Sequence, residues 1–433
     1  MQDGIRTLDQ RMWRGSACFA LLLVLSVSIV HAQAQDATQE RLKAVEDRMH
    51  ALEAEVNSLR AALAAVGTAP PTPAPTSPAL PQLPPGPTSG TPEQQPVYGG
   101  GGAAAGAKAF NPDIGMIGNF VGVSGHNTIN PLPSLSMQES ELSLQAIIDP
   151  YARADFFLAI GEEGIEVEEG YITFPALPGG FALRAGRMRA AFGRVNTFHN
   201  HTLPWIDRPL AAFNLLGGSL KEADVGIKDA GLSVSRILPS IRGIFLEATG
   251  EVFRGDSGSL FSATRRSDIS TVGRLRSYGD FTESTNLELG ASYARGHNDV
   301  GSHFITQLYG ADATLHWRPL RRAIYHSFAA RSEFYWSHRE EVLDTQRAFG
   351  FFSSAEYQIG RRWFTGGRYD WSERARNAAQ HDSSGSLVLT YWPSEFSQIR
   401  TQFRRTRYAE KQVANEVIFQ FLFTIGAHGA HPF

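Results

Sequence analysis

The sequence lacks three features that would place it in a common class of protein. Its 433 residues contain one cysteine, Cys18, within an apolar stretch near the N-terminus. Once that stretch is removed, the chain can form no disulfide, thiolate nucleophile or cysteine-ligated metal site. After residue 30 no run of about 18 apolar residues occurs, which excludes transmembrane helices. No long run of Lys and Arg residues is present either, so the sequence gives no indication of nucleic-acid binding.

Motifs of catalysis and nucleotide binding are missing as well. No Gly-x-Ser-x-Gly nucleophile elbow, Walker loop or dinucleotide-binding glycine pattern occurs in the required context. The sequence therefore predicts no catalytic residue, no cofactor and no enzymatic activity.

The N-terminus has the pattern of a secretory signal. Three arginines precede an apolar stretch over residues 17–30, and Ala32 and Ala34 follow it. A positive region, an apolar core and an Ala-x-Ala exit predict export with cleavage after Ala34. Residues 1–34 are therefore interpreted as a signal peptide.

Residues 36–66 carry heptads. Apolar residues recur in alternating steps of three and four, at Leu42, Val45, Met49, Leu52, Val56, Leu59, Leu63 and Val66. A helix this short needs a partner for its apolar seam, which predicts an α-helical coiled coil in the periplasm. An amphipathic helix packed on the following domain is the alternative. The heptads fix no oligomeric state, and contact with peptidoglycan stays open.

Residues 67–109 have the composition of a linker. Nine prolines between residues 70 and 87 favour an extended polyproline II spacer, and four consecutive glycines at 99–102 supply a flexible joint. This segment has no core to bury.

Residues 110–433 alternate with period two, as β-strands do. Tyr369 and Trp371 share one parity, for example, while Arg368 and Asp370 share the other. A soluble β-sandwich also alternates, but here the polar parity carries full charges and the apolar parity repeatedly ends in Trp or Tyr. Those two features favour an all-β, transmembrane antiparallel β-barrel in the outer membrane of a Gram-negative bacterium.

Connections between the predicted strands fall into two kinds. Short turns occur at Asp149-Pro150 and Pro393–Glu395, whereas longer polar stretches at 254–270, 296–302, 340–346 and 375–383 are typical of extracellular loops. At roughly 20 residues per strand and connection, the barrel should have about 16 strands, wide enough for an aqueous channel. The last strand is expected at Asn415–Ile425.

Residues 183–193 read Leu-Arg-Ala-Gly-Arg-Met-Arg-Ala-Ala-Phe-Gly. This stretch resembles the Gly-[Lys/Arg]-x-[Lys/Arg]-x-x-Phe-Gly motif of the phosphate-selective porin O/P family. Ala223–Ile227 and Tyr391–Pro393 are similar to later segments of that family. The resemblance implies a trimeric barrel that sits in outer-membrane lipid and passes anionic or small polar solutes by diffusion.

The residues predicted to line the pore are arginines from the polar parity and from the motif. An arginine donates hydrogen bonds in a planar fork that suits phosphate and carboxylate. The predicted pore-lining and anion-binding set is Arg153, Arg184, Arg187, Arg189, Arg331, Arg368, Arg400 and Arg404. Asp155, Glu333 and Asp370 lie among them, so the lumen carries both signs and a general polar pore stays open beside an anion-selective one.

The segment from Asn196 to Leu220 is expected to fold inward and constrict the pore. Its candidate constriction residues are His199, His201, Asp207 and Arg208. His199 and His201 form a pair of potential metal ligands, but the sequence shows no third ligand, so no metal site is predicted.

The sequence as a whole predicts a passive outer-membrane porin. Two alternatives remain: a structural barrel that anchors the outer membrane to the cell wall through its coiled coil, and a component of an energised uptake system. An energised receptor would need an N-terminal plug, whereas a heptad segment and a linker precede this barrel.

Overall fold

A computed structural model describes residues 112–426, except for 162–163, 218–224 and 242. The predicted signal peptide (1–34), coiled coil (36–66) and linker (67–109) lie outside the described residues. Within them, no helix is long and apolar enough to cross a membrane.

Strands dominate the described part of the chain. They are β1 Asp113–His126, β2 Leu135–Asp149, β3 Ala152–Gly161, β4 Gly164–Leu177, β5 Phe181–Arg189, β6 Lys228–Ile241, β7 Ile244–Phe253, β8 Ser270–Thr282, β9 Thr285–His297, β10 Ile305–Trp317, β11 Phe328–Glu340, β12 Thr345–Gly360, β13 Trp363–Arg374, β14 Asn377–Ser394, β15 Ser397–Arg407 and β16 Val413–Gly426. The described part of the connection between β5 and β6 contains three short helices: η1 Val195–Thr197, η2 Asn200–Thr202 and α3 Leu210–Leu215.

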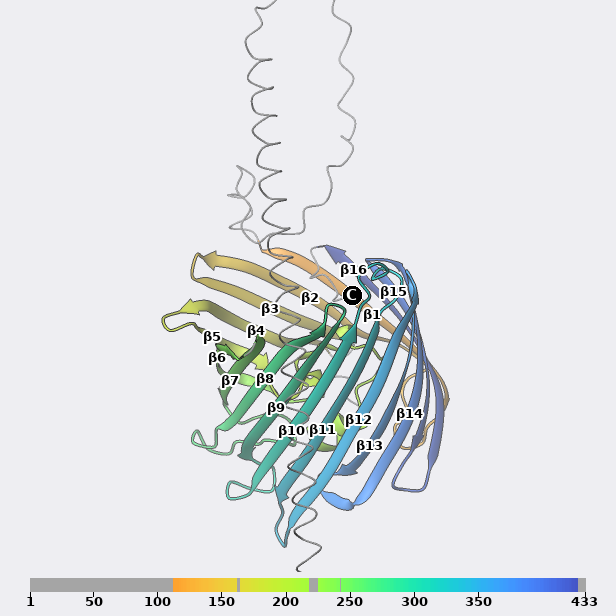
Figure 1. The fold of residues 1–433 in the computed structure, drawn as a ribbon. Helices are drawn as coiled ribbons and strands as arrows, with labels where there is room; N and C mark the ends of the chain where they lie inside the picture. Colours follow the sequence, from red (N-terminus) through yellow and green to blue (C-terminus); the bar gives the residue numbers. More distant parts are fainter. Residues whose placement is uncertain (1–111, 162–163, 218–224, 242, 427–433) are drawn as a thin grey trace, which may run out of the picture. The chain divides into compact units, whose positions relative to one another are not determined.

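Each strand pairs antiparallel with its neighbours in the sequence, and the ring closes where β1 meets β16 (Figure 1). The closing register runs from Gly115 opposite Gly426 to His126 opposite Asn415. Closure leaves no sheet edge with unpaired backbone groups. The predicted antiparallel barrel of 16 strands is confirmed, including the closing strand at the C-terminal end.

The two ends of the barrel differ in their connections. At the end defined here as the turn end, most connections are tight, as at 150–151, 178–180, 361–362 and 395–396. At the opposite loop end several connections are longer, as at 127–134, 254–269, 298–304 and 408–412, although two residues, 375–376, join β13 to β14.

One predicted loop proves to be strand. Most of the polar stretch 375–383 belongs to β14, which begins at Asn377 and pairs with β13 through His381 opposite Glu373. The polar residues of this stretch indicate contact with water but not the absence of a strand. A hairpin that projects into water can keep its backbone pairing with polar residues on both faces.

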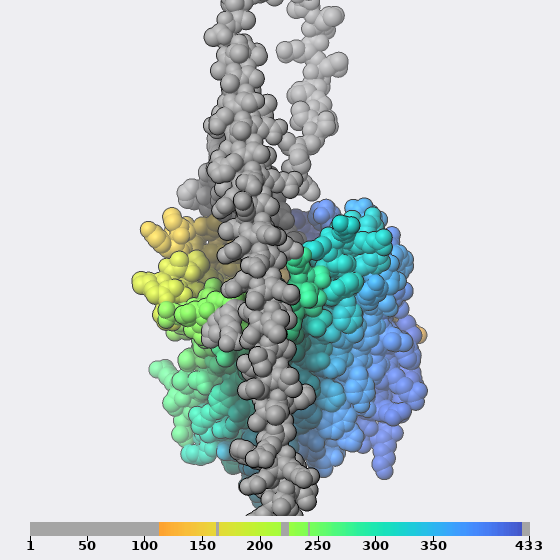
Figure 2. Space-filling view, in the orientation of Figure 1, coloured from red at the N-terminus to blue at the C-terminus, as the bar shows by residue number. Residues whose placement is uncertain are grey.

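The wall of the barrel is apolar outside and polar inside. Large apolar side chains are exposed on the outer face, including Leu275, Leu289, Tyr309, Trp336, Tyr369, Leu387, Phe403, Val417 and Phe419. Inward-facing polar side chains are buried, including Glu288, Asp312, Glu333, Arg368, Asp370, Gln402, Arg404 and Gln420. In Figure 2 the atoms of the teal-to-blue strands pack side by side and form an outer surface without a visible gap. This inversion of a soluble protein's pattern is that of a barrel embedded in lipid.

Candidate functional site

The connection between β5 and β6 does not extend outward but folds into the barrel, as the sequence predicts. Its described part, residues 190–217, is called the inward segment here, and its yellow-green ribbon lies inside the ring of strands (Figure 1). Phe192 packs against Tyr335 of β11, Trp205 meets Phe352 of β12 edge to face, and Ile206 packs with apolar side chains of β1 and β16. The inward segment therefore reaches opposite sides of the lumen.

A sharp turn starts this inward path. Gly193 has a φ of 60°, and a Cβ at that position would collide with the carboxylate of Glu333. Glu333 in turn accepts hydrogen bonds from the backbone N–H groups of Val195 (2.7 Å) and Arg194 (3.1 Å). A glycine is needed here because the left-handed turn brings the backbone against the β11 carboxylate.

Asp207 attaches the inward segment to β13 and β15. Its carboxylate accepts hydrogen bonds from Arg368 at 3.1 Å, Arg404 at 2.6 Å and Gln402 at 2.5 Å. Burial alone would raise the pKa of Asp207, but the two guanidinium groups outweigh it and lower that pKa to about 2. Arg368 also lies over the Trp205 ring, with its guanidinium carbon 4.8 Å from the ring centroid. We call Arg368, Arg400 and Arg404 the basic anchor.

Two more arginines hold the backbone of the inward segment. Arg400 donates to the carbonyl oxygens of Leu203 (2.8 Å) and Trp205 (3.1 Å). Arg208 donates within the segment, to the carbonyl oxygens of Val195 and Phe198 and to the Asn200 side chain. These bonds satisfy backbone groups that would otherwise be buried without partners.

The wall formed by β2 and β4 presents carboxylates. His199 Nδ1 lies 2.7 Å from Glu141 of β2 and 3.3 Å from Glu168 of β4, and its Nε2 lies 2.7 Å from Glu169. Burial lowers the pKa of His199, but the hydrogen bonds to Glu141 and Glu169 and the negative charge of Glu168 raise it well above its usual range. A carboxylate oxygen of Glu139 lies within 4.8 Å of those of Glu141 and Glu168, and we call these three residues together with Glu169 the acidic anchor.

The remaining predicted arginines of β3 and β5 do not converge on one point. Arg153 pairs with Asp155 at 2.5 Å, and Arg184 lies over the ring of Tyr171. Arg187 has the opposite strand parity to Arg184 and pairs with Glu166 at 3.2 Å. Arg189 is buried, 2.6 Å from Glu168. The motif that carries the family resemblance therefore lies at the base of the inward segment.

A cavity of about 390 Å³ lies between the inward segment and the turn ends of β9–β15. Its lining includes Thr202, Leu203 and Pro204 of the inward segment, together with aromatic side chains of the wall. Four arginines also line it, Arg194, Arg318, Arg331 and Arg400, with Glu356 as the acidic residue among the lining side chains.

The charges of this cavity do not balance locally. Arg194 pairs with Glu288, and Arg331 has Glu356 at 3.9 Å. In the described part of the chain, neither Arg318 nor Arg400 forms an ion pair. The cavity is therefore electropositive.

Sequence reasoning missed several of these residues. The four carboxylates of the acidic anchor and the cavity arginines Arg194 and Arg318 were not among the predicted site residues. For Glu139 and Glu141 a signal existed, because residues two apart on a strand share a face. The contacts of Asp207 with Arg368 and Arg404 join residues more than 160 positions apart in the sequence, which strand parity cannot predict.

No family model matches the chain. A curated protein of Aquifex aeolicus (strain VF5), described as an uncharacterized protein, is 28% identical over 385 residues, which span 75% of this chain and 81% of that protein. The membership in the phosphate-selective porin O/P family stays a prediction.

Solved structures of outer-membrane proteins resemble the barrel. A loop L8 deletion mutant of OmpT from Vibrio cholerae is 10% identical with a TM-score of 0.50, and the alignment covers 72% of this chain and 99% of that one. An anion-selective porin from Comamonas acidovorans is also 10% identical, with a TM-score of 0.49, over 72% of this chain and 98% of that one. The likeness to the OmpT deletion mutant supports the barrel fold and carries no information on function.

Proposed function

We propose that the chain is an outer-membrane channel for passive diffusion that favours anionic or small polar solutes, phosphate among them. The observation that carries this proposal is the electropositive cavity beside the inward segment. A diffusion channel needs a narrow, water-filled path whose charges compensate a solute for lost hydration. Arginines at that point suit phosphate and carboxylate groups.

The two ends of the barrel support an orientation. Outer-membrane barrels have short turns on the periplasmic side and longer loops outside the cell. We assign the turn end to the periplasm on this rule, and the cavity to the periplasmic half of the path. A solute from outside would then pass the inward segment before it reaches the arginines.

The preference for anions is supported by what the lumen carboxylates contact. Glu141, Glu169 and Glu333 accept hydrogen bonds from the inward segment, and Asp207 is held between two arginines. Charges that are paired in this way attract a passing cation little, whereas Arg318 and Arg400, which form no ion pair with the described residues, remain at the cavity.

The remaining parts of the chain complete the proposal. Residues 1–34 would direct export, 36–66 would form a periplasmic coiled coil, and 67–109 would connect that coiled coil to the barrel at 110–433. A homotrimer and a contact between the coiled coil and peptidoglycan belong to this proposal as well.

Arg331→Gln tests the role of the cavity. A unit charge about 8 Å away in water changes the energy of an anion and of a cation by about 0.5 kcal/mol each, in opposite directions, so this change should lower the anion-to-cation permeability ratio roughly fivefold. The ratio is measured from reversal potentials in planar bilayers. Arg405→Gln is the matched control, because Arg405 is exposed on the outer parity of β15 and should leave the ratio unchanged. Equal effects of the two variants would refute the assignment.

A second candidate function has its own support. The inward segment shares a large apolar cluster with the wall, including Phe192, Leu215, Phe253, Phe261 and Tyr335. A lumen filled with packed side chains also suits a structural barrel that conducts little. Planar bilayers separate the two candidates, since the structural barrel produces no current steps.

A further inference from the structure

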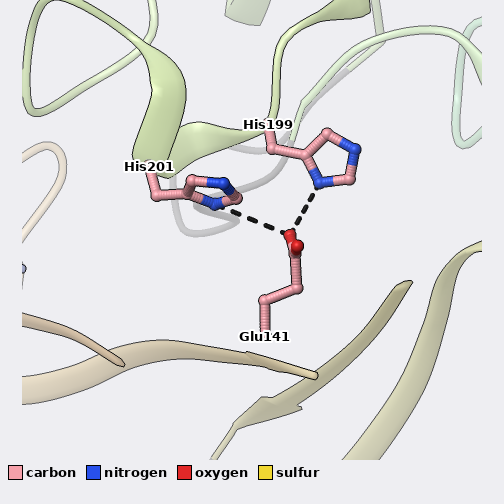
Figure 3. A group of neighbouring side chains, drawn as sticks. All are labelled: Glu141, His199 and His201. Atoms are coloured by element: carbon pink, nitrogen blue, oxygen red, sulfur yellow. Dashed lines mark hydrogen bonds and ion pairs between the residues drawn. The ribbon is translucent and has the colours of Figure 1, made fainter. Parts of the chain in front are cut away.

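The inward segment and β2 bring together two imidazoles and a carboxylate. His199 and His201 project from the start of η2, and Glu141 projects toward both rings from β2 (Figure 3). All three are buried, and one ligand atom from each lies within 4.8 Å of the other two. The sequence offered the histidine pair but no third ligand, and Glu141 is that third group.

We propose that Glu141, His199 and His201 bind a divalent transition-metal ion of the zinc class, which fastens the inward segment to the barrel wall. Two imidazole nitrogens with one carboxylate oxygen form a donor set typical of zinc. Calcium and magnesium, which take oxygen ligands, do not suit this set.

The spacing of the donor atoms supports a small tetrahedral site. Around a zinc ion with bonds of about 2.0 Å, neighbouring ligand atoms lie roughly 3.3 Å apart. Glu141 Oε2 lies 2.7 Å from His199 Nδ1 and 3.5 Å from His201 Nδ1. These two distances lie on either side of the tetrahedral value, and the two imidazole nitrogens lie within 4.8 Å of each other.

Groups behind the ligands support the proposal independently. A metal-binding histidine usually donates its second ring N–H to a carboxylate, which fixes the ring. His199 has this arrangement, since its Nε2 lies 2.7 Å from Glu169 Oε2. Phe157 covers the same ring, with the centroids 5.0 Å apart.

Glu168 provides an oxygen that points at the site. Its Oε1 pairs with Arg189 at 2.6 Å. Its buried Oε2 lies 3.3 Å from His199 Nδ1, whose single hydrogen is already shared with Glu141 at the shorter distance of 2.7 Å. Within the described residues, Glu168 Oε2 has no hydrogen-bond partner. It is therefore placed as a fourth ligand or as an acceptor for a metal-bound water.

Charge also favours a cation here. Within the described residues, three carboxylates converge on the single ring of His199, those of Glu141, Glu168 and Glu169, and Arg189 pairs with Glu168. Buried charge without compensation is costly, and a divalent ion would offset it more fully than a single ring proton.

Zinc titration of the untagged, full-length protein tests the site. The protein is stripped with a chelator and titrated with zinc chloride against a chromophoric competitor. We expect one zinc per chain and an X-ray absorption spectrum with two imidazole ligands. His201→Gln should abolish this binding, and Glu169→Gln should weaken it about 10- to 100-fold, since Glu169 positions the ring of a ligand.

Controls exclude other histidines. His428 and His431 are replaced by glutamine in every sample, and His338→Gln, outside the cluster, should leave the affinity unchanged. Absence of stoichiometric binding in the otherwise native chain, a spectrum without imidazole, or unchanged affinity in His201→Gln would each overturn the proposal. The spectrum needs no change in the cluster, so it decides the matter even if a cluster variant fails to fold.

Discussion

The two walls that hold the inward segment have opposite charge and differ in how that charge is balanced. In the basic anchor, Arg368 and Arg404 pair with three carboxylates, those of Asp207, Asp370 and Glu416, while Arg400 forms no ion pair within the described residues. In the acidic anchor, carboxylates outnumber the arginine and the protonated histidine that contact them within the described residues. Buried carboxylates that are paired with arginines need no further counter-ion, whereas a surplus of buried carboxylates is stabilised by a cation bound from solution.

The largest change in unfolding free energy is expected when the basic anchor loses the charge of Asp207. The pKa of Asp207 is lowered to about 2, below that of an unfolded aspartate, so its charge stabilises the fold above about pH 4. This stabilisation is lost as the pH falls through 2. Near pH 7 the unfolding free energy of the wild type should exceed that of Asp207→Asn by about 2.5 kcal/mol. This difference between the two proteins should vanish as the pH approaches 2.

Urea unfolding in detergent, repeated from neutral to acidic pH, measures this difference. Subtracting the two proteins cancels the titration of carboxylates that they share. A difference that does not change with pH would contradict the role of Asp207 as a charged anchor.

A smaller effect of different sign is expected at the acidic anchor. Glu139→Gln removes one charge from a cluster with a surplus of negative charge. In chelator-treated protein the change should alter the unfolding free energy by about 0–1 kcal/mol, toward greater stability, because like-charge repulsion falls. Glu416→Gln is the matched comparison in the basic anchor, and it should destabilise because Arg404 loses a partner 2.7 Å away. Equal losses in both variants would remove the distinction between the walls.

Much of the wall could be predicted from the sequence because strand parity is a local property. Alternation predicted that Arg368 and Asp370 face inward, and both are buried there while Tyr369 is exposed. Parity fails where the strand is irregular. A register shift in β4 beside Phe157 lets the adjacent residues Glu168 and Glu169 both contact His199.

The site itself depends on the path of the inward segment, which no local pattern fixes. The histidine pair was visible in the sequence, but its carboxylate partner lies 58 residues away on β2. The same holds for the cavity, since Arg194 and Arg318 reach it from two different connections. Contacts of this kind follow from tertiary packing, so the sequence predicted the channel wall more fully than the constriction.

The reversal potential of the wild-type channel in a tenfold gradient of potassium chloride tests the central claim most directly. Glu141, Glu169 and Glu333 are bonded to the inward segment, while Arg318 and Arg400 at the cavity form no ion pair with the described residues, so we expect a potential of the sign that marks chloride as the more permeant ion. A potential of the opposite sign, or a folded barrel without current steps, would contradict it.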